Sequence, residues 1–274
     1  MKKLFSIVAF LAFATVGYAQ SDDFGIWTSF EAQKKINKKV NISLEGELRT
    51  RDNVSTNDRW SIGLDASYKL TKWLKASAGY TFLYDNNERI SYYEAGDKKV
   101  EQGVVNIGDP KKRGEYWGPR HRFNISLTAS KSFGNLEISL RERWQYTYRP
   151  EKTVSERYSY WDEEMDGEEH TYRGKGKNVL RSRLQLEYKL KNIGLTPYAS
   201  VELSNAWDVE KIRYTIGADY KITKQHAFGL FYRYQDIRRR RLRDRTQHAH
   251  LGRKLQIQIL SACVTRFLSR LPRG

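Results

Sequence analysis

The sequence contains few of the residues that cross-link or interrupt a folded chain. Its 274 residues include one cysteine, two methionines and five prolines. A single cysteine, Cys263, excludes an intrachain disulfide. The one long apolar run, Leu4–Val16, is shorter than the roughly 20 residues that a membrane-spanning helix needs. The sequence therefore predicts no transmembrane helix, although hydropathy does not detect membrane barrels, because the two faces of each strand average out.

The apolar run belongs to a segment with the three parts of a secretory signal peptide. Met1-Lys2-Lys3 supplies the basic start, and Gly17 and Ala19 are the small residues that precede a cleavage site. A buried N-terminal helix is the alternative, but the run has no amphipathic period. We therefore interpret residues 1–19 as a cleaved signal peptide.

Basic residues are distributed unevenly along the chain. A net charge of +17 first suggests a nucleic-acid-binding protein. Residues 238–274, however, hold eleven Lys/Arg and one Asp, so ten of the seventeen net charges lie in this tail. The sequence has no Gly-rich phosphate loop, zinc signature or nucleophile elbow. We therefore predict no nucleic-acid partner and no cofactor.

From Val40 onward, apolar and polar residues alternate in short runs, as in β-strands with one apolar and one polar face. One irregularity is Glu142, which falls on the apolar face, and Phe24–Gln33 is a weaker strand. The clear runs are Val40–Arg51, Trp60–Leu70, Leu74–Tyr84, Phe123–Ala129, Leu136–Tyr148, Leu184–Leu190, Leu195–Leu203, Ile212–Tyr220 and Phe228–Tyr234.

The connections between these runs alternate in length. Short connections are Ile36–Lys39, Thr71–Trp73, Ser132–Asn135, Lys191–Gly194 and Thr223–His226, and long ones are Asp52–Arg59, Asp85–Pro119 and Pro150–Gly176. Short turns at one end and long loops at the other are typical of outer-membrane barrels. Residues 20–237 are therefore predicted to form an all-β, antiparallel up-and-down transmembrane β-barrel of about 10–12 strands in the outer membrane of a Gram-negative bacterium.

The strand count raises a parity problem. Ten strands precede residue 237 when the weak first strand is included, and one more closing strand would make eleven. Bacterial single-chain barrels normally have even strand numbers. The sequence therefore leaves two alternatives: Phe24–Gln33 is not a barrel strand, or a further strand lies within Asp85–Pro119.

A soluble periplasmic β-barrel binding protein would show the same alternation with its apolar face turned inward. Three features favour the membrane barrel: the export signal, strands of 9–12 residues, and aromatic residues at the strand ends. These aromatic residues suggest two girdles, one marked by Tyr68, Tyr188 and Tyr220, and the other by Trp60, Tyr84, Trp144, Tyr148, Trp207 and Tyr234.

The polar strand faces are rich in charge, and in a membrane barrel they line the lumen. Two interpretations remain open: a charged, selective pore, or an ion-pair network that fills a narrow barrel and closes it. The predicted lumen residues are Glu45, Glu47, Arg49, Arg51, Asp65, Arg141, Arg143, Arg181, Arg183, Glu187, Glu202, Arg213, Asp219 and Arg233.

One predicted loop is strongly acidic and is a candidate calcium site, although its spacing does not match an EF-hand. A solvated acidic loop is the alternative. Its carboxylates are Asp162, Glu163, Glu164, Asp166, Glu168 and Glu169. Catalysis by a barrel hydrolase would need a serine within hydrogen-bond reach of a histidine. His121, His170 and His226 have no obvious serine partner on their faces.

Several local sequences resemble the outer-membrane family catalogued as domain of unknown function 2490, common in Bacteroidetes. They are Asp23-Phe24-Gly25-Ile26-Trp27, Glu45-Gly46-Glu47-Leu48-Arg49 and Phe231-Tyr232-Arg233-Tyr234-Gln235. The resemblance covers residues 22–236 and implies a barrel. It implies no activity and no catalytic residues.

The sequence thus predicts a barrel that is a narrow, porin-like channel, a receptor or a structural membrane protein, with no enzymatic activity. A barrel-embedded enzyme that modifies lipid or lipopolysaccharide is the alternative. The expected partners are outer-membrane lipid and the barrel-assembly machinery.

Residues 238–274 break the strand pattern and are predicted to be a frameshift product that replaces the last strand. Ordinary codons for Gln247–Ser261 read, one base later, as Asn-Thr-His-Ile-Leu-Gly-Val-Ser-Tyr-Lys-Tyr-Lys-Phe-stop. That reading alternates again and ends on phenylalanine. The alternative is a genuine basic tail that binds polyanions.

Overall fold

The computed structural model describes residues 25–206, 209–223, 225–237, 253–256 and 264–267. The predicted signal peptide, residues 1–19, lies outside the described residues, as does most of the basic tail. Among the described residues, no helix has the length and apolar character needed to cross a bilayer.

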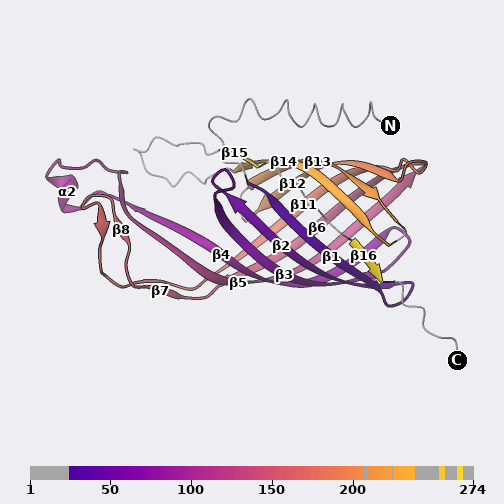
Figure 1. Ribbon diagram of the computed structural model, residues 1–274, viewed down its shortest axis with the longest axis horizontal. Helices are drawn as coiled ribbons and strands as arrows, with labels where there is room; N and C mark the ends of the chain where they lie inside the picture. Colours follow the sequence, from indigo (N-terminus) through magenta and orange to yellow (C-terminus); the bar gives the residue numbers. More distant parts are fainter. Residues whose placement is uncertain (1–24, 207–208, 224, 238–252, 257–263, 268–274) are drawn as a thin grey trace.

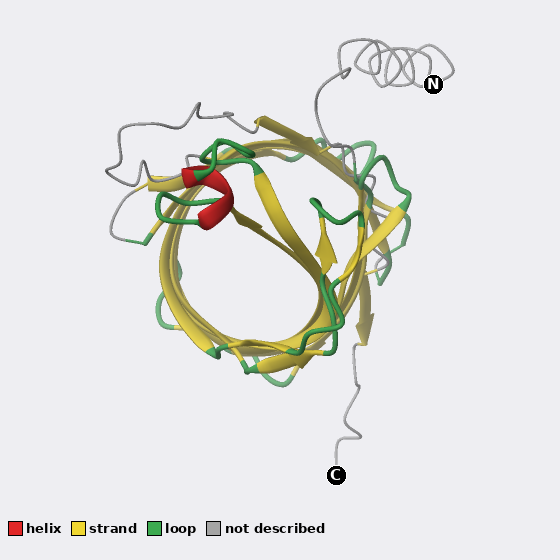
Figure 2. Ribbon diagram, turned by 90° about the vertical axis from the view of Figure 1, so that its left-hand side faces the viewer, coloured by secondary structure: helices red, strands yellow, loops and turns green. Residues whose placement is uncertain are grey.

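Ten consecutive antiparallel strands curl into a barrel wall (Figures 1 and 2). Each strand pairs with its sequence neighbours in the wall, so the topology is up-and-down. The strands are β1 (Trp27–Lys35), β2 (Val40–Arg51), β3 (Thr56–Lys69), β4 (Leu74–Tyr92), β5 (Pro110–Phe133), β6 (Leu136–Arg149), β11 (Lys175–Tyr188), β12 (Leu195–Asn205), β13 (Val209–Lys221) and β14 (Ala227–Ile237).

The wall is polar inside and apolar outside, the reverse of a soluble protein. Ser126 and Glu202 are 2% and 4% exposed, whereas Leu48 and Ile216 are 62% and 59% exposed. The alternation of strand faces produces this inversion because most outward positions carry an apolar residue. The soluble alternative, which requires an apolar interior, is therefore wrong.

Short turns lie at one end of the barrel, here called the turn end. In two of them a side-chain oxygen accepts hydrogen bonds from backbone amides of the same turn. Asn37 Oδ1 accepts hydrogen bonds from the amides of Lys39 and Val40. Thr71 Oγ1 accepts them from Trp73 and Leu74 in the next turn. A side-chain oxygen that mimics a backbone carbonyl stabilises a tight reversal, which fixes the register of the hairpin that follows.

The opposite end, here called the loop end, carries a hairpin that projects from the barrel (Figure 1). The predicted loop Asp85–Pro119 is wrong over most of its length, because β4 continues to Tyr92 and β5 begins at Pro110. A short helix, α2 (Lys98–Glu101), lies between them. We call β4 beyond Asn86, β5 before Gly118 and their connection the arm.

The segment between β6 and β11 folds back on the arm. Strand β8 (Tyr158–Ser159) pairs with β5 and with β9 (Glu164–Met165). Two further short strands, β7 (Lys152–Val154) and β10 (His170–Tyr172), pair with each other. Pro150–Gly176 is therefore partly ordered as strands instead of being one long loop.

The two parity alternatives both fail. Trp27–Lys35 is a barrel strand paired with β2, and Asp85–Pro119 contains no further strand of the barrel wall. Strand β1 runs from the loop end to the turn end, whereas β14 runs the other way. A strand returning from β14 must therefore run parallel to β1. Strand β15 (Arg253–Gln256) pairs antiparallel with β14, and β16 (Val264–Phe267) pairs parallel with β1.

Candidate functional site: the charged lumen

The predicted lumen residues all share the strand face of buried polar side chains. Ser61, Gln145 and Thr215 are 8%, 8% and 5% exposed and mark that face on β3, β6 and β13. Because side chains alternate along a strand, the charged residues an even number of positions away lie on the same side. The outward Glu142, irregular in the sequence pattern, accepts a hydrogen bond from Ser182 Oγ at 2.6 Å.

Glu202 on β12 is the centre of the ion-pair network. Its Oε2 lies 2.9 Å from Arg141 Nη2, and its Oε1 lies 3.1 Å from Arg181 Nε and 3.2 Å from Arg213 Nη1. The carboxylate side chain is only 5% exposed. Three guanidiniums compensate for the cost of removing this carboxylate from water.

Four arginines of β6 and β11 stand in register beside Glu202. In the register of the two strands, Arg143 is directly opposite Arg181, and Arg141 is directly opposite Arg183. We call these four residues the arginine square. Like charges directly opposite each other destabilise a sheet unless anions lie between them. Glu202 contacts Arg141 and Arg181, which occupy one diagonal of the square.

Arg143 and Arg183, on the other diagonal, form no ion pair, although Arg183 is directly opposite Glu202 on β12. Among the described residues, no carboxylate oxygen lies within 4.0 Å of Arg143 or Arg183. Arg143 Nε is also buried without a hydrogen-bond partner. Asp65 and Glu202 interact with Arg143 electrostatically, and Glu202 and Glu187 interact with Arg183, but none of them forms an ion pair with these two arginines. The square therefore holds more cationic charge than the lumen carboxylates neutralise.

An indole lies between two of the lumen arginines. The Arg49 guanidinium carbon is 3.4 Å from the ring centroid of Trp27, and that of Arg233 is 5.2 Å away. Trp27 is 5% exposed. It connects β1, β2 and β14 through cation–π contacts inside the barrel. The sequence pattern did not identify this role, because Trp27 precedes the first clear alternating run.

Carboxylates occupy the half of the lumen nearest the turns. Glu31 and Glu45 face each other on β1 and β2, and Asp65, Glu187 and Asp219 lie at similar distances from their own turns. Gly79 makes room for one of them, since a Cβ there would lie 2.2 Å from Asp65 Oδ1. Most of the lumen arginines follow farther from the turns, together with Glu47 and Glu202, so cationic charge predominates in that half.

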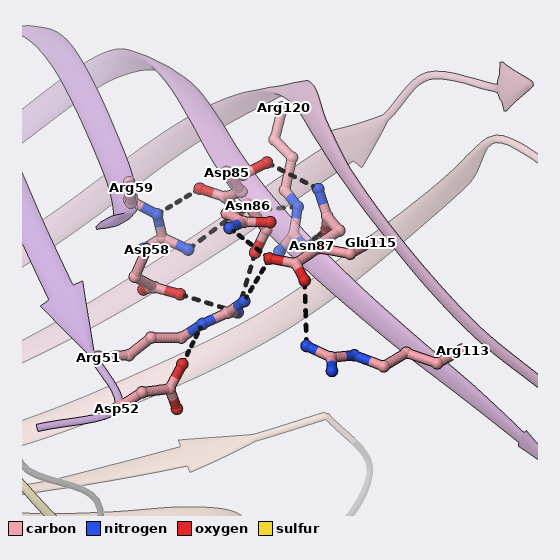
Figure 3. A network of polar contacts seen from close by, with 10 residues as sticks. All are labelled: Arg51, Asp52, Asp58, Arg59, Asp85, Asn86, Asn87, Arg113, Glu115 and Arg120. Carbon is pink, nitrogen blue, oxygen red and sulfur yellow. Dashed lines mark hydrogen bonds and ion pairs between the residues drawn. The ribbon is translucent and has the colours of Figure 1, made fainter. Parts of the chain in front are cut away.

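A third group of charges lies where the barrel wall meets the arm (Figure 3). Arg51 contacts Asp52, Asp58 and Glu115 at 3.2, 3.6 and 3.5 Å. Asp85, 3% exposed, is paired with Arg59 and lies 2.9 Å from Arg120 Nε. This rim cluster links the β2–β3 turn to the base of the arm.

Among the charged residues of the inward face that the sequence pattern did not identify are Arg59, Asp85, Arg120 and Arg122. Arg59 and Asp85 lie in segments that were predicted as loops. Arg120 and Arg122 lie between a predicted loop and the first residue of the next predicted strand. Parity could have found Arg122, which lies two positions from the inward Asn124. Asp85 likewise continues the face of Leu83, which is fully buried.

The acidic loop contacts cations of the chain itself. Lys112 Nζ lies 2.8 Å from Asp166 and 3.0 Å from Glu168. Burial alone would raise the pKa of Asp166, but hydrogen bonds from Lys112 and from the amides of Arg157 and Glu168 hold this pKa well below its usual range. Within the described ranges, no group of three or more His, Cys, Asp and Glu residues is arranged to hold a metal. The calcium site stays a prediction without a converging ligand set.

Two of the three candidate histidines, His121 and His170, lie apart from the lumen network, and the third, His226, lies in the short turn between β13 and β14. His121 is on the outer face, where its Nδ1 shares a 2.8 Å hydrogen bond with Tyr80 OH. His170 contacts the ring of Tyr172, and its pKa is lowered by burial. The group that contacts the His121 ring nitrogen is thus a tyrosine and not the serine that a hydrolase pair would need.

Residues 24–246 match a family described as protein of unknown function, DUF2490. The chain belongs to this family. The match includes the whole barrel wall and ends within the basic tail. The resemblance noted in the sequence is therefore confirmed. A search of curated proteins found no match to this DUF2490 chain.

Solved structures similar to the DUF2490 chain include two autotransporter domains. The beta domain of the Bordetella autotransporter BrkA has a TM-score of 0.47 at 11% identity and covers 78% of this chain and 91% of its own. The translocator domain of NalP from Neisseria meningitidis has a TM-score of 0.45 at 12% identity, and the match covers 85% of this chain and 89% of that domain. A mutant of the monoaromatic hydrocarbon channel TodX has a TM-score of 0.41 at 12% identity, and the match covers 84% of this chain and 77% of that channel.

Proposed function

We propose that this DUF2490 protein is a narrow outer-membrane channel whose lumen prefers anions. The observation that carries the proposal is the excess of guanidiniums over carboxylates in the middle of the barrel. Rings of charged side chains select permeant ions by sign, and cationic rings favour anions. The exposed apolar belt supports placement in a bilayer, and residues 1–19 support export through a cleaved signal peptide.

Water reaches the charged face, which supports a conducting lumen over a filled one. Glu45 and Asp219 face inward and are nevertheless exposed. The turn-end half is also lined by short side chains such as Ser77 and Gly79, which occupy little space. An ion-pair network that closes the barrel would bury these carboxylates against cations, and neither has an ion pair among the described residues.

Planar-bilayer recordings test the channel. With a KCl gradient across the bilayer, we expect the reversal potential of the refolded full-length protein to shift toward the chloride equilibrium potential. A shift toward the potassium potential, or no conductance beyond that of protein-free bilayers, would overturn the proposal. Fractionation of cells tests the location, since recovery in the soluble periplasm contradicts an outer-membrane barrel.

We further propose that residues 238–274 replace the native last strand through a frameshift. An uncovered edge in lipid leaves backbone groups unsatisfied, so β14 requires a strand beside it. Residues 253–256 pair with β14, and in the shifted frame this stretch belongs to the alternating sequence that ends on phenylalanine. Resequencing the gene decides the matter: an uninterrupted frame through Gly274 refutes the frameshift. If the frame is shifted, the restored chain inserts into vesicles more completely than this chain.

A further inference from the structure

We propose that the arginine square contains a binding site for a small phosphate-type oxyanion, held between Arg143 and Arg183. The inference rests on the proposed channel only for access from solution. Its basis is the unequal treatment of the two diagonals of the square, one of which is occupied by a carboxylate of the protein.

Glu202 shows how an oxyanion fits this part of the wall. Its two oxygens accept from Arg141 and Arg181 and so bridge one diagonal. Arg143 and Arg183 occupy the other diagonal in the same register, with the same side-chain chemistry. Diagonal neighbours in an antiparallel pair are roughly 7–8 Å apart, within the reach of long side chains. A tetrahedral oxyanion between them would accept from both guanidiniums.

The unmet hydrogen-bonding capacity points to a ligand. A guanidinium offers five N–H donors and no acceptor. Arg141 Nε, Arg143 Nε and Arg122 Nε are all buried without a hydrogen-bond partner in the described part of the chain. Arg122 also lies close enough to Arg181 for the two to repel each other. Buried donors without partners are costly, and an oxyanion bound between Arg143 and Arg183 would accept from the free donors of these two guanidiniums.

Charge selects the class of ligand. Glu202 neutralises one of the four charges of the square, while Asp65 and Glu187 act on Arg143 and Arg183 without forming ion pairs. A dianion would balance the remaining diagonal, whereas chloride has one charge and no fork geometry to match. Planar guanidiniums bind phosphate and carboxylate oxygens in pairs. Because the square lies inside the wall, the ligand must be a water-soluble phosphate and not the headgroup of a lipid in the bilayer.

Blockade of the chloride current tests the site. Inorganic phosphate is added at constant ionic strength to the full-length protein in planar bilayers, and glycerol 3-phosphate is added in a separate arm. We expect saturable block by phosphate. Arg143→Gln and Arg183→Gln should each raise the half-blocking concentration about tenfold, the effect of losing one charge-assisted hydrogen bond. Stronger block by glycerol 3-phosphate identifies a phosphate ester, and equal or weaker block identifies the free ion.

Arg149→Gln is the matched control. Arg149 is on the same face of β6, nearer the loop end, and contacts Tyr116 OH and the Arg173 carbonyl. The Arg149→Gln substitution removes one charge from the lumen and leaves the arginine square unchanged. The half-blocking concentration of phosphate for this variant should therefore equal that for the unmodified protein. Block that is non-saturable, or that is weakened equally by all three substitutions, refutes the site and indicates general screening.

Thermal unfolding in detergent separates this inference from the channel. Phosphate should raise the midpoint of the unmodified protein more than chloride at equal ionic strength, and the rise should vanish in Arg143→Gln. Stabilisation without conductance supports the site and refutes the channel. Anion-selective conductance with neither stabilisation nor saturable block supports the channel and refutes the site.

Discussion

The two halves of the lumen differ in charge although they are built from the same ten strands. Near the turns, Glu31, Glu45, Asp65, Glu187 and Asp219 line the wall with serine and glycine beside them. Farther along the same strands, arginines predominate and share few carboxylates. In the first half Glu45 and Asp219 are exposed to solvent, and in the second half Glu202 and Trp27 hold the cations together.

This difference shows that charge alone does not decide how a lumen residue behaves. A carboxylate that reaches solvent requires no partner, whereas a buried one must be compensated or it destabilises the fold. Glu45 and Glu202 illustrate the two cases. Glu45 is exposed to solvent, whereas Glu202 is buried, at 4% exposure, and has three arginines around it. The same substitution should therefore have very different effects in the two halves.

The largest effect is expected at Glu202. Glu202→Gln leaves Arg141, Arg181 and Arg213 without their shared anion, and breaking a buried ion pair on one side costs about 3–5 kcal/mol. Urea unfolding of the protein in detergent measures the loss. The control is Glu45→Gln, which removes a solvated carboxylate from the other half and should change the unfolding free energy by less than about 1 kcal/mol. Equal losses for the two variants would remove the distinction between the halves.

A smaller effect is expected at Trp27, which lies between Arg49 and Arg233. Trp27→Leu removes both cation–π contacts and should lower the unfolding free energy by about 2 kcal/mol. Trp27→Phe keeps an aromatic face and should lose less. The same urea titration compares them, and a phenylalanine variant as unstable as the leucine variant would show that ring area, not the contact with cations, matters here.

The acidic half should oppose the anion preference of the arginine half. Asp65→Asn removes a negative charge on the permeation path, so the reversal potential in a KCl gradient should move farther toward the chloride potential. Glu137→Gln is the control, because Glu137 is at the turn end and already pairs with Lys189. A shift of the same size in both variants would mean that net charge, and not position, sets selectivity.

The smallest effect concerns the arm, outside both halves. The lowered pKa of Asp166 means that its ion pair with Lys112 contributes stability above the unfolded pKa of about 3.9 and loses it as the pH falls below that value. Asp166→Asn should therefore speed amide hydrogen exchange in β8 and β9 at pH 7 and pH 5. The difference from the unmodified protein should shrink below pH 4. A difference that is constant down to pH 3 would contradict the ion pair.

The barrel could be predicted from sequence because alternation is a local property. The alternation within Trp60–Leu70 and within Leu136–Tyr148 is enough to predict which side chains face outward. The same side chains face outward in β3 and β6. The lengths of β4 and β5 could not be predicted in the same way. Their distal parts pair with each other outside the barrel, where both faces are free of lipid and alternation is not required.

The sequence by itself determined the fold class, the short turns and the identity of most lumen residues, since each follows from the period of the strand or from a side chain two or three positions away. Only the tertiary structure decided which charges meet. Arg141 and Glu202 are 61 residues apart and meet because one strand, β11, separates their own. Trp27 and Arg233 lie near opposite ends of the described wall and meet because the sheet curls. Register and curvature are properties of the whole sheet, so the pairing of these charges cannot be read from any single strand.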